Sequence, residues 1–196
     1  METKKYPSAS DSTFGKFKQF WHWLWNSNSI LSWIVSFVLA FILVRFVFYP
    51  LIGLALQTSL PLVVIESNSM ERHFDFEGWW KAHEDFYDGI GITKGEAEKW
   101  PFPNGINEGD IAIIRGKDFQ DLKEGDVIVF QPSPQNKAII HRIVRLHENY
   151  VETKGDANIG QIEFEKNVRS EQIRGVAIAR IPYLGWIKLF FVRAFS

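Results

Sequence analysis

Serine, histidine and aspartate residues that could act together in nucleophilic catalysis lie at separate points of this chain. Ser67 and Ser69 follow the apolar run PLVVIE, His141 lies inside the run AIIHRIVRL, and Asp156 closes a Lys-Gly-Asp triplet. A serine hydroxyl is a weak nucleophile until a base takes its proton, and an imidazole with a pKa of about 6.5 suits that task near neutral pH. A carboxylate behind the ring would hold its tautomer. The same residues also fit two plain turns and a core histidine, so residue types alone leave both interpretations open.

The composition excludes several other classes of chemistry. The 196 residues carry 22 Lys and Arg against 23 Asp and Glu, so no basic excess is available to neutralise the phosphates of a nucleic acid. The absence of cysteine excludes disulfide frameworks, thiolate catalysis and cysteine-based zinc sites. No standard metal-ligand spacing is matched by the cluster of His73, Asp75, His83, Glu84 and Asp85. We therefore expect no metal, no other cofactor and no nucleic-acid partner.

The apolar residues gather in a block near the start of the chain. Between Ile30 and Leu56 the only charged residue is Arg45, and roughly 20 helical residues suffice to cross a hydrocarbon core of about 30 Å. Pro50 lacks a backbone donor and predicts that the regular helix ends near that residue. We expect residues 1–29 to form a tail, residues 30–56 a transmembrane anchor, and residues 57–196 one compact domain.

Flanking charges predict the side of the membrane that each part occupies. Lys4, Lys5, Lys16 and Lys18 precede the apolar block, whereas the next basic residue after Arg45 comes well beyond it. Because basic residues stay on the cytoplasmic side, we expect a cytoplasmic N-terminus and an extracytoplasmic domain. A buried core helix or a cleaved signal peptide fits this long block less well, since it is nearly uncharged and no small-x-small cleavage site follows it closely.

The segment after the block is typical of short strands separated by turns. Gly, Pro, Asn and Asp interrupt its β-branched runs. The strands that we expect span residues 61–66, 111–115, 127–130, 138–146, 150–153 and 175–181. This pattern favours a mostly β domain, a small barrel or sandwich, behind one N-terminal helix.

Two aromatic stretches interrupt or follow the strands. The region at about 71–107 is charged and aromatic, with a short helix expected around 78–87, and it fits an insertion that acts as a lid or a docking surface. The end of the chain, residues 184–195, is too short and too charged to span a membrane but could rest on its surface.

Five short motifs follow the anchor in a fixed order. They are Ser67-Asn68-Ser69-Met70-Glu71, Gly125-Asp126-Val127-Ile128, Ile140-His141-Arg142-Ile143, Thr153-Lys154-Gly155-Asp156 and Ile181-Pro182-Tyr183-Leu184-Gly185. In this order they resemble signal peptidase I of the archaeal and endoplasmic-reticulum type, a family of serine peptidases. The resemblance covers roughly residues 60–190, is interrupted at 71–107, and implies a β-rich catalytic domain of signal-peptidase type.

The resemblance implies a role for each matching residue. Ser69 would be the nucleophile, and His141 stands where the bacterial branch of the family uses a lysine base. Ser67 would help the Ser69 backbone N–H to bind the oxyanion, a contribution of about 10²–10³ in rate. Asp156 is the favoured acid behind the histidine, with Glu163 as the alternative if the register changes slightly.

The chain departs from the family pattern at two positions. Ile162 stands where the family commonly carries a second carboxylate, and Arg72 stands where proline usually follows Ser-Met-Glu. These departures bear on the acid and on substrate specificity more than on the type of reaction.

We therefore expect a membrane-bound serine endopeptidase that cleaves N-terminal signal peptides from secreted preproteins at the outer membrane face. Its expected partners are such preproteins, the lipid bilayer and the protein-translocation channel, in a plasma membrane or, in a eukaryote, the endoplasmic-reticulum membrane. Two alternatives stay open: a non-catalytic, membrane-tethered β-domain that docks on the secretion machinery, and a narrower membrane protease for surface proteins. A Ser69 hydroxyl within ~4 Å of a His141 ring nitrogen favours catalysis, and a separation beyond ~8 Å favours the docking domain.

Overall fold

The computed structural model describes residues 13–133 and 137–195, which belong to two compact units, one ending at Leu51 and one starting at Ile52. Lys4 and Lys5, which contribute to the predicted orientation, lie outside the described residues.

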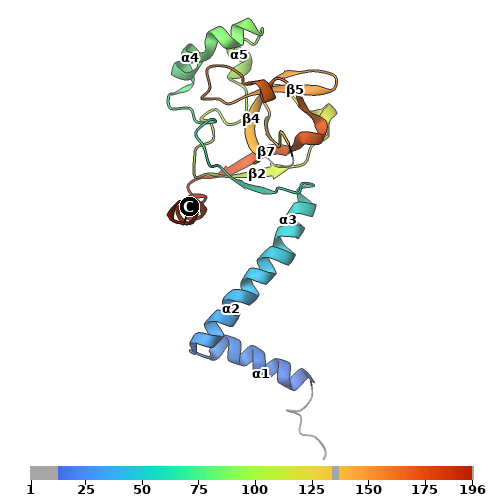
Figure 1. Ribbon diagram of the computed structural model, residues 1–196, viewed down its shortest axis with the longest axis vertical. Helices are drawn as coiled ribbons and strands as arrows, with labels where there is room; N and C mark the ends of the chain where they lie inside the picture. Colours follow the sequence, from blue (N-terminus) through green and yellow to red (C-terminus); the bar gives the residue numbers. More distant parts are fainter. Residues whose placement is uncertain (1–12, 134–136, 196) are drawn as a thin grey trace, which may run out of the picture. The chain divides into compact units, whose positions relative to one another are not determined.

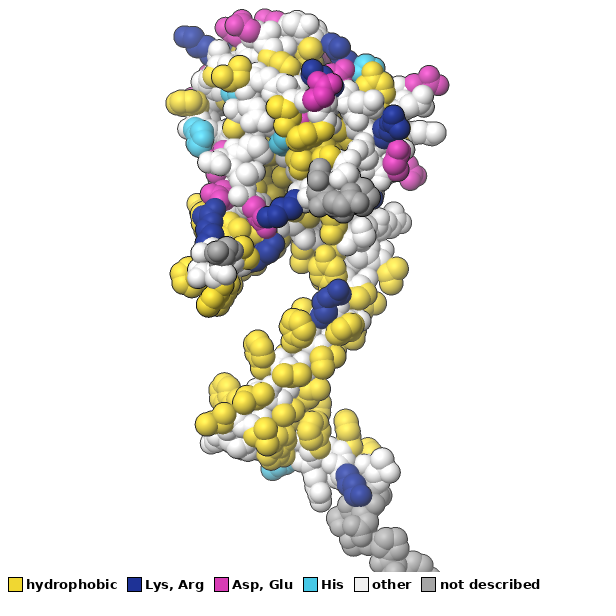
Figure 2. Space-filling view, viewed as in Figure 1, with side chains coloured by type: hydrophobic (Ala, Val, Ile, Leu, Met, Phe, Trp, Pro, Cys, Tyr) yellow, Lys and Arg dark blue, Asp and Glu magenta, His cyan; other side chains and the backbone are white. Residues whose placement is uncertain are grey.

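Helices make up most of residues 13–55 (Figure 1). Helix α1 spans Thr13–Asn26. A second, continuous helix consists of α2 (Ile30–Leu43), η2 (Val44–Phe48) and α3 (Tyr49–Ala55). This helix has 26 residues and is long and apolar enough to cross a membrane, judged by its length and composition. Figure 2 shows that hydrophobic side chains cover most of its visible surface.

The helix does not end at Pro50, contrary to the prediction. Residues 44–48 form a π-helical turn, in which the Tyr49 backbone N–H donates to the Val44 carbonyl. A proline ring inside an α-helix clashes with a carbonyl one turn earlier, and the wider π turn directly before Pro50 relieves that clash. The helix therefore continues to Ala55.

The second unit is built on one curled antiparallel sheet, which confirms the predicted fold class (Figure 1). Its strands are β1 (Leu62–Val64), β2 (Ile111–Arg115), β3 (Val127–Phe130), β4 (Ile139–Leu146), β5 (Tyr150–Lys154), β6 (Val168–Arg169) and β7 (Ile173–Ile181). The order across the seven-stranded sheet is β1-β2-β7-β3-β4-β5-β6. Register shifts in the β2–β7, β3–β7 and β4–β5 pairs mark bulges, which bend strands and increase the twist of a sheet.

Alternate residues of the central strand β3 contribute to two separate apolar clusters. Val127 and Val129 pack with Ile65, Met70 and their neighbours. Ile128 and Phe130 pack with a second group. That second group consists of Leu122, Ile128, Phe130, Ile143, Val151, Val168 and Val176. Because successive side chains of a strand point to opposite faces, the sheet buries apolar residues on both sides here.

The region between β1 and β2 forms a small helical insertion, as the sequence predicted. Helix α4 spans Phe76–Gly89, starts at the N-cap Asp75, and is followed by the short helix α5 (Lys94–Ala97). Trp79, Trp80 and Tyr87 of α4 pack against Val144 of β4. Ile92, Ala97 and Trp100, which follow α4 in the chain, complete this cluster. The insertion is thus packed on the sheet by a core of its own.

Short helical segments complete the second unit. The 3-10 turns are η3 (Phe119–Asp121), η4 (Glu163–Glu165) and η5 (Ser170–Gln172). Helix α6 (Trp186–Ala194) ends the chain, with Leu189 buried and ion pairs joining Lys188 to Glu66 and Arg193 to Glu108. Contact of this helix with a membrane surface stays a prediction.

Candidate active site

Ser69 lies in a tight turn in the loop that follows β1. The Glu71 N–H donates to the Asn68 carbonyl at 3.0 Å, and the Ile106 N–H donates to the Met70 carbonyl at 2.9 Å, so the turn is bonded to the segment that enters β2. Met70 is fully buried beneath it. The hydrogen bonds and the buried methionine fix the turn, while the side chain of Ser69 stays partly accessible.

His141 reaches this turn from β4. Its position in the strand is fixed by pairing with Ile128 of β3, and only 4% of its surface is exposed. Its Nε2 atom lies 3.1 Å from the Ser69 hydroxyl oxygen. The Ser67 hydroxyl lies 3.3 Å from the same oxygen. The sheet thus brings together a hydroxyl, an imidazole and a second hydroxyl that are far apart in the sequence.

Glu165 is the carboxylate on the other side of the imidazole. Its Oε1 atom lies 2.5 Å from the His141 Nδ1 atom, in a bent arrangement rather than a straight ring N–H hydrogen bond. Its Oε2 atom accepts the Ile162 backbone N–H at 2.7 Å, which closes the turn η4. The side chain is fully buried. A carboxylate held in this way can orient the ring and stabilise its positive charge.

The structure places Asp156 and Glu163 elsewhere, in contrast to the prediction. Both Asp156 carboxylate oxygens face guanidinium groups: Arg142 donates at 2.8 and 2.6 Å, and Arg72 donates at 3.0 Å. The Glu163 side chain is 92% exposed and pairs with Lys166. Of the three carboxylates, the one at the imidazole is therefore that of Glu165.

A buried network of charges surrounds Asp156. Burial raises the pKa of Asp156, but Arg142 and Arg72 outweigh burial and hold its pKa below the ordinary value. The negative charges of Asp156 and Glu165 raise the pKa of Lys154, but burial has the larger effect and lowers it to about 8. The carboxylate of Asp156 is thus buried among three cationic side chains, those of Arg72, Arg142 and Lys154.

The insertion supplies aromatic walls to this network. The Arg72 guanidinium lies 3.6 Å from the centre of the Trp79 ring, and the indole N–H of Trp79 donates to the Asp156 carbonyl at 2.8 Å. The Lys154 ammonium lies 5.1 Å from the centre of the Tyr87 ring. Cation–π contacts of this kind are stronger when they are shielded from water. The insertion therefore packs against the buried charged residues around Asp156.

The loop that carries Asp156 also contacts the backbone of Ser69. The Ala157 N–H donates to the Ser69 carbonyl at 2.9 Å. A Cβ atom at Gly155 would lie 2.6 Å from that carbonyl oxygen, so the loop passes too close for a larger residue. Asp156 thus holds the loop that positions the serine.

Replacing Asp156 by asparagine is expected to destabilise the folded domain by about 3–5 kcal/mol, because two buried guanidinium groups lose their counter-charge. Since the folded pKa of Asp156 lies below its ordinary value of 3.8, its stabilisation is complete above about that pH and is lost on further acidification. Urea unfolding of wild type and Asp156→Asn at pH 7 measures the loss. The matched control, Glu163→Gln, changes an exposed carboxylate and should stay within about 0.5 kcal/mol. Equal stabilities of wild type and Asp156→Asn would contradict the ion-pair network.

A groove of about 690 Å³ leads to the serine and the histidine. Its apolar walls include Leu62 and Val64 of β1 and Ile139 of β4. In the described residues β1 pairs with β2 alone, and β4 pairs with β5 only from Arg142 onward, so each strand presents a free edge here. An extended peptide could add a strand at such an edge.

Sequence reasoning identified Ser67, Ser69 and His141, which the structure brings together, and missed Glu165. Glu163 and Glu165 flank Phe164 in the run IEFEK, and no local pattern separates the exposed carboxylate from the buried one. The ion pair of Arg72 with Asp156 was also missed. The sequence signal for this ion pair was an arginine at position 72, where the resemblance leads us to expect proline.

Known proteins with similar sequences point to one class of enzyme. No family model matches the chain. Over 154 residues it is 25% identical to the signal peptidase complex catalytic subunit SEC11 of Scheffersomyces stipitis, which covers 74% of this chain and 73% of that protein. Over 157 residues it is 24% identical to the protein of the same name from Saccharomyces cerevisiae, which covers 74% of each chain.

These distant similarities support a protease of the signal peptidase type, in agreement with the motifs in the sequence. The apolar helix Ile30–Ala55 is consistent with a single-pass membrane protein.

Proposed function

We propose that this chain is a membrane-bound serine endopeptidase that removes N-terminal signal peptides from secreted preproteins. The observation that carries the proposal is the 3.1 Å contact between the Ser69 hydroxyl and His141 Nε2, with Glu165 behind the ring. This contact is well inside the ~4 Å limit set for catalysis and favours it over a docking domain.

The Ser69 oxygen attacks the scissile carbonyl carbon while His141 Nε2 takes the hydroxyl proton. The negative charge on the carbonyl oxygen is stabilised by the Ser67 hydroxyl and by the Ser69 backbone N–H, which has no acceptor in the described residues. The protonated imidazole then gives its proton to the departing amine, which is the new N-terminus of the mature protein. Glu165 stabilises the imidazolium during these steps.

Water completes the reaction. His141 takes a proton from a water molecule, whose oxygen attacks the acyl ester on Ser69. Collapse of this second tetrahedral intermediate breaks the bond to the serine oxygen, which recovers its proton from the imidazolium. The signal peptide leaves with a free carboxylate, and the enzyme returns to its starting state.

The groove between β1 and β4 supports an extended substrate. Backbone hydrogen bonds to the two free strand edges would hold the peptide, and small side chains at the first and third positions before the cut would fit beside the apolar walls. We propose the extracytoplasmic face of a plasma membrane, or of the endoplasmic-reticulum membrane in a eukaryote, as the place of cleavage, with the protein-translocation channel as a partner. The basic residues before the helix support this orientation.

The test uses the full chain, purified in detergent micelles, and a presecretory protein as substrate. We expect one cut, located by mass spectrometry of both products directly after a small residue at the end of the signal peptide. Changing that residue from alanine to phenylalanine should abolish the cut, whereas the same change ten residues into the mature region should not. Absence of cleavage, or cutting that ignores the substitution, would overturn the proposed function.

A further inference from the structure

A second cavity lies beside the end of the apolar helix, away from the serine and histidine. It has a volume of about 960 Å³ and is entirely part of the unit that starts at Ile52. Its lining comes from the end of α3, the end of β2, the turns η3 and η5, and the start of β7. None of its lining residues borders the groove that leads to Ser69.

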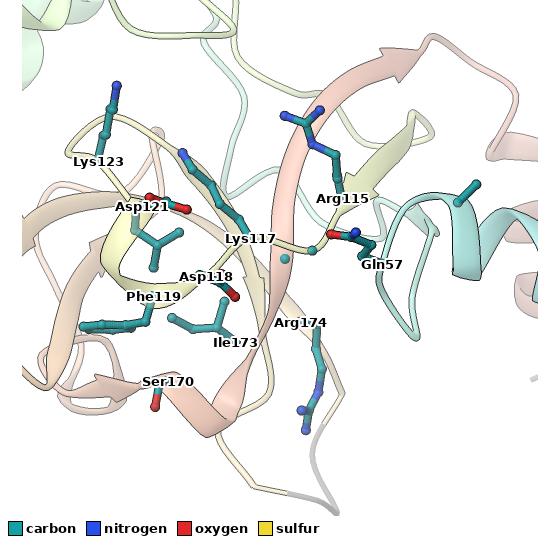
Figure 3. A pocket seen from close by; sticks show the side chains of 14 residues that line it. Gln57, Arg115, Lys117, Asp118, Phe119, Asp121, Lys123, Ser170, Ile173 and Arg174 are labelled. Carbon is teal, nitrogen blue, oxygen red and sulfur yellow. The ribbon is translucent and has the colours of Figure 1, made fainter.

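Basic side chains are prominent in this cavity. They belong to Arg115, Lys117, Lys123 and Arg174. In Figure 3, the side chains of the first three extend to one side of the cavity and that of Arg174 to the other. Only Lys117 has a carboxylate partner in the described residues, Asp126 at 2.7 Å.

The other three cations form no ion pair within the described residues. Arg174 donates only to neutral groups, the Glu171 carbonyl at 3.1 Å and the Gln131 side chain at 3.3 Å. Arg115 and Lys123 are exposed, and neither has an ion pair within residues 13–133 and 137–195. These three groups are therefore available to an anion.

Two acids, Asp118 and Asp121, also line the cavity (Figure 3). Both belong to the segment around η3 and are exposed. Carboxylates repel a phosphate but accept hydrogen bonds from hydroxyl groups. The mixed lining therefore fits a ligand that carries a phosphate together with hydroxyl groups.

The backbone that lines the cavity is hydrogen-bonded to the residue that follows α3. The Gly116 N–H donates to the Leu56 carbonyl at 2.7 Å, and a Cβ atom at Gly116 would lie 2.0 Å from the Gln57 carbonyl oxygen. A helix of 26 residues is about 39 Å long, which exceeds the ~30 Å hydrocarbon core and approaches the thickness with headgroups included. If this helix spans the bilayer, Gln57 and the cavity beside it lie at the depth of the headgroups.

We propose that this cavity binds the headgroup of an anionic phospholipid, with the phosphate on the side to which Arg115 and Lys123 extend and headgroup hydroxyls at the two aspartates. Phosphatidylglycerol has this combination of groups. Basic sites next to membrane helices attract anionic headgroups through the same charge complementarity. The bound lipid would hold the β domain at a fixed height above the bilayer.

The experiment titrates the full chain in neutral detergent with phosphatidylglycerol, phosphatidylcholine or soluble glycerol phosphate, and counts bound molecules by native mass spectrometry. We expect the wild type to prefer phosphatidylglycerol over both other probes. The double variant Arg115→Gln/Lys123→Gln should bind phosphatidylglycerol about 25-fold more weakly, since each basic residue near a membrane surface contributes about fivefold. Binding of phosphatidylcholine should not change.

The matched control is Lys81→Gln/Lys99→Gln, which removes two exposed basic residues of the insertion region. It should bind phosphatidylglycerol as the wild type does, and the melting temperatures of both double variants should match that of the wild type. The proposal is overturned if the cavity variant binds phosphatidylglycerol normally, or if the control weakens binding equally. Equal wild-type affinity for glycerol phosphate and the lipid would also overturn it. None of these outcomes depends on peptidase activity.

Discussion

Ser69→Ala is expected to lower the rate of preprotein cleavage by about 10⁶-fold, because removing a catalytic serine costs about as much as removing its whole triad. Without the hydroxyl there is no oxygen to form the acyl ester, and the residual rate reflects the remaining binding and oxyanion contacts. The measurement is the release of mature protein, quantified by mass spectrometry with enzyme in excess over substrate.

Two comparisons separate this loss from damage to the fold. The Ser69 hydroxyl is partly exposed and is hydrogen-bonded to Ser67 and His141, not to the apolar core, so the melting temperature of Ser69→Ala should match that of the wild type. Ser67→Ala removes one oxyanion donor and should cost only about 10²–10³ in rate. Cleavage by Ser69→Ala at the wild-type rate would contradict its role as nucleophile.

Glu165→Gln is expected to lower the cleavage rate by about 10⁴-fold, the magnitude found when the acid behind a catalytic histidine becomes an amide. The Oε1 atom lies 2.5 Å from His141 Nδ1. An amide there removes the negative charge that stabilises the imidazolium and can favour the wrong tautomer of the ring. The readout is the same single-turnover release of mature protein.

The matched control is Glu163→Gln, two residues away on the same turn. Its carboxylate is 92% exposed and pairs with Lys166, so its loss should leave the cleavage rate within a factor of two. If Glu163→Gln abolished cleavage and Glu165→Gln did not, the acid would have to be reassigned.

Local sequence patterns were sufficient to predict most of the sheet. The strands β2 and β3 begin and end at the predicted residues, since β-branched runs between turn residues have few alternatives. The two-residue strand β6 was missed because Val168 and Arg169 form no such run. The expected end of the regular helix near Pro50 was wrong because a π-helical turn accommodates this proline.

The proximity of Ser69 and His141 could be predicted because both residues belong to short motifs that occur in a recognisable order. The carboxylate beside the imidazole could not be predicted, because its position depends on how a loop folds back. Asp156 is held by Arg72 and Arg142, and η4 then brings Glu165 to the imidazole. The contacts of Arg72 depend on the insertion, whose packing against β4 no local pattern encodes.

The claim that Ser69 and His141 act as one catalytic unit is tested most directly by measuring preprotein cleavage for Ser69→Ala, His141→Ala and the double variant. We expect both single variants to lose cleavage, and the double variant to be no slower than Ser69→Ala within a few-fold, because either change disables the same step. Wild-type cleavage by His141→Ala, or a double variant whose loss is the product of the two single losses, would contradict a shared mechanism.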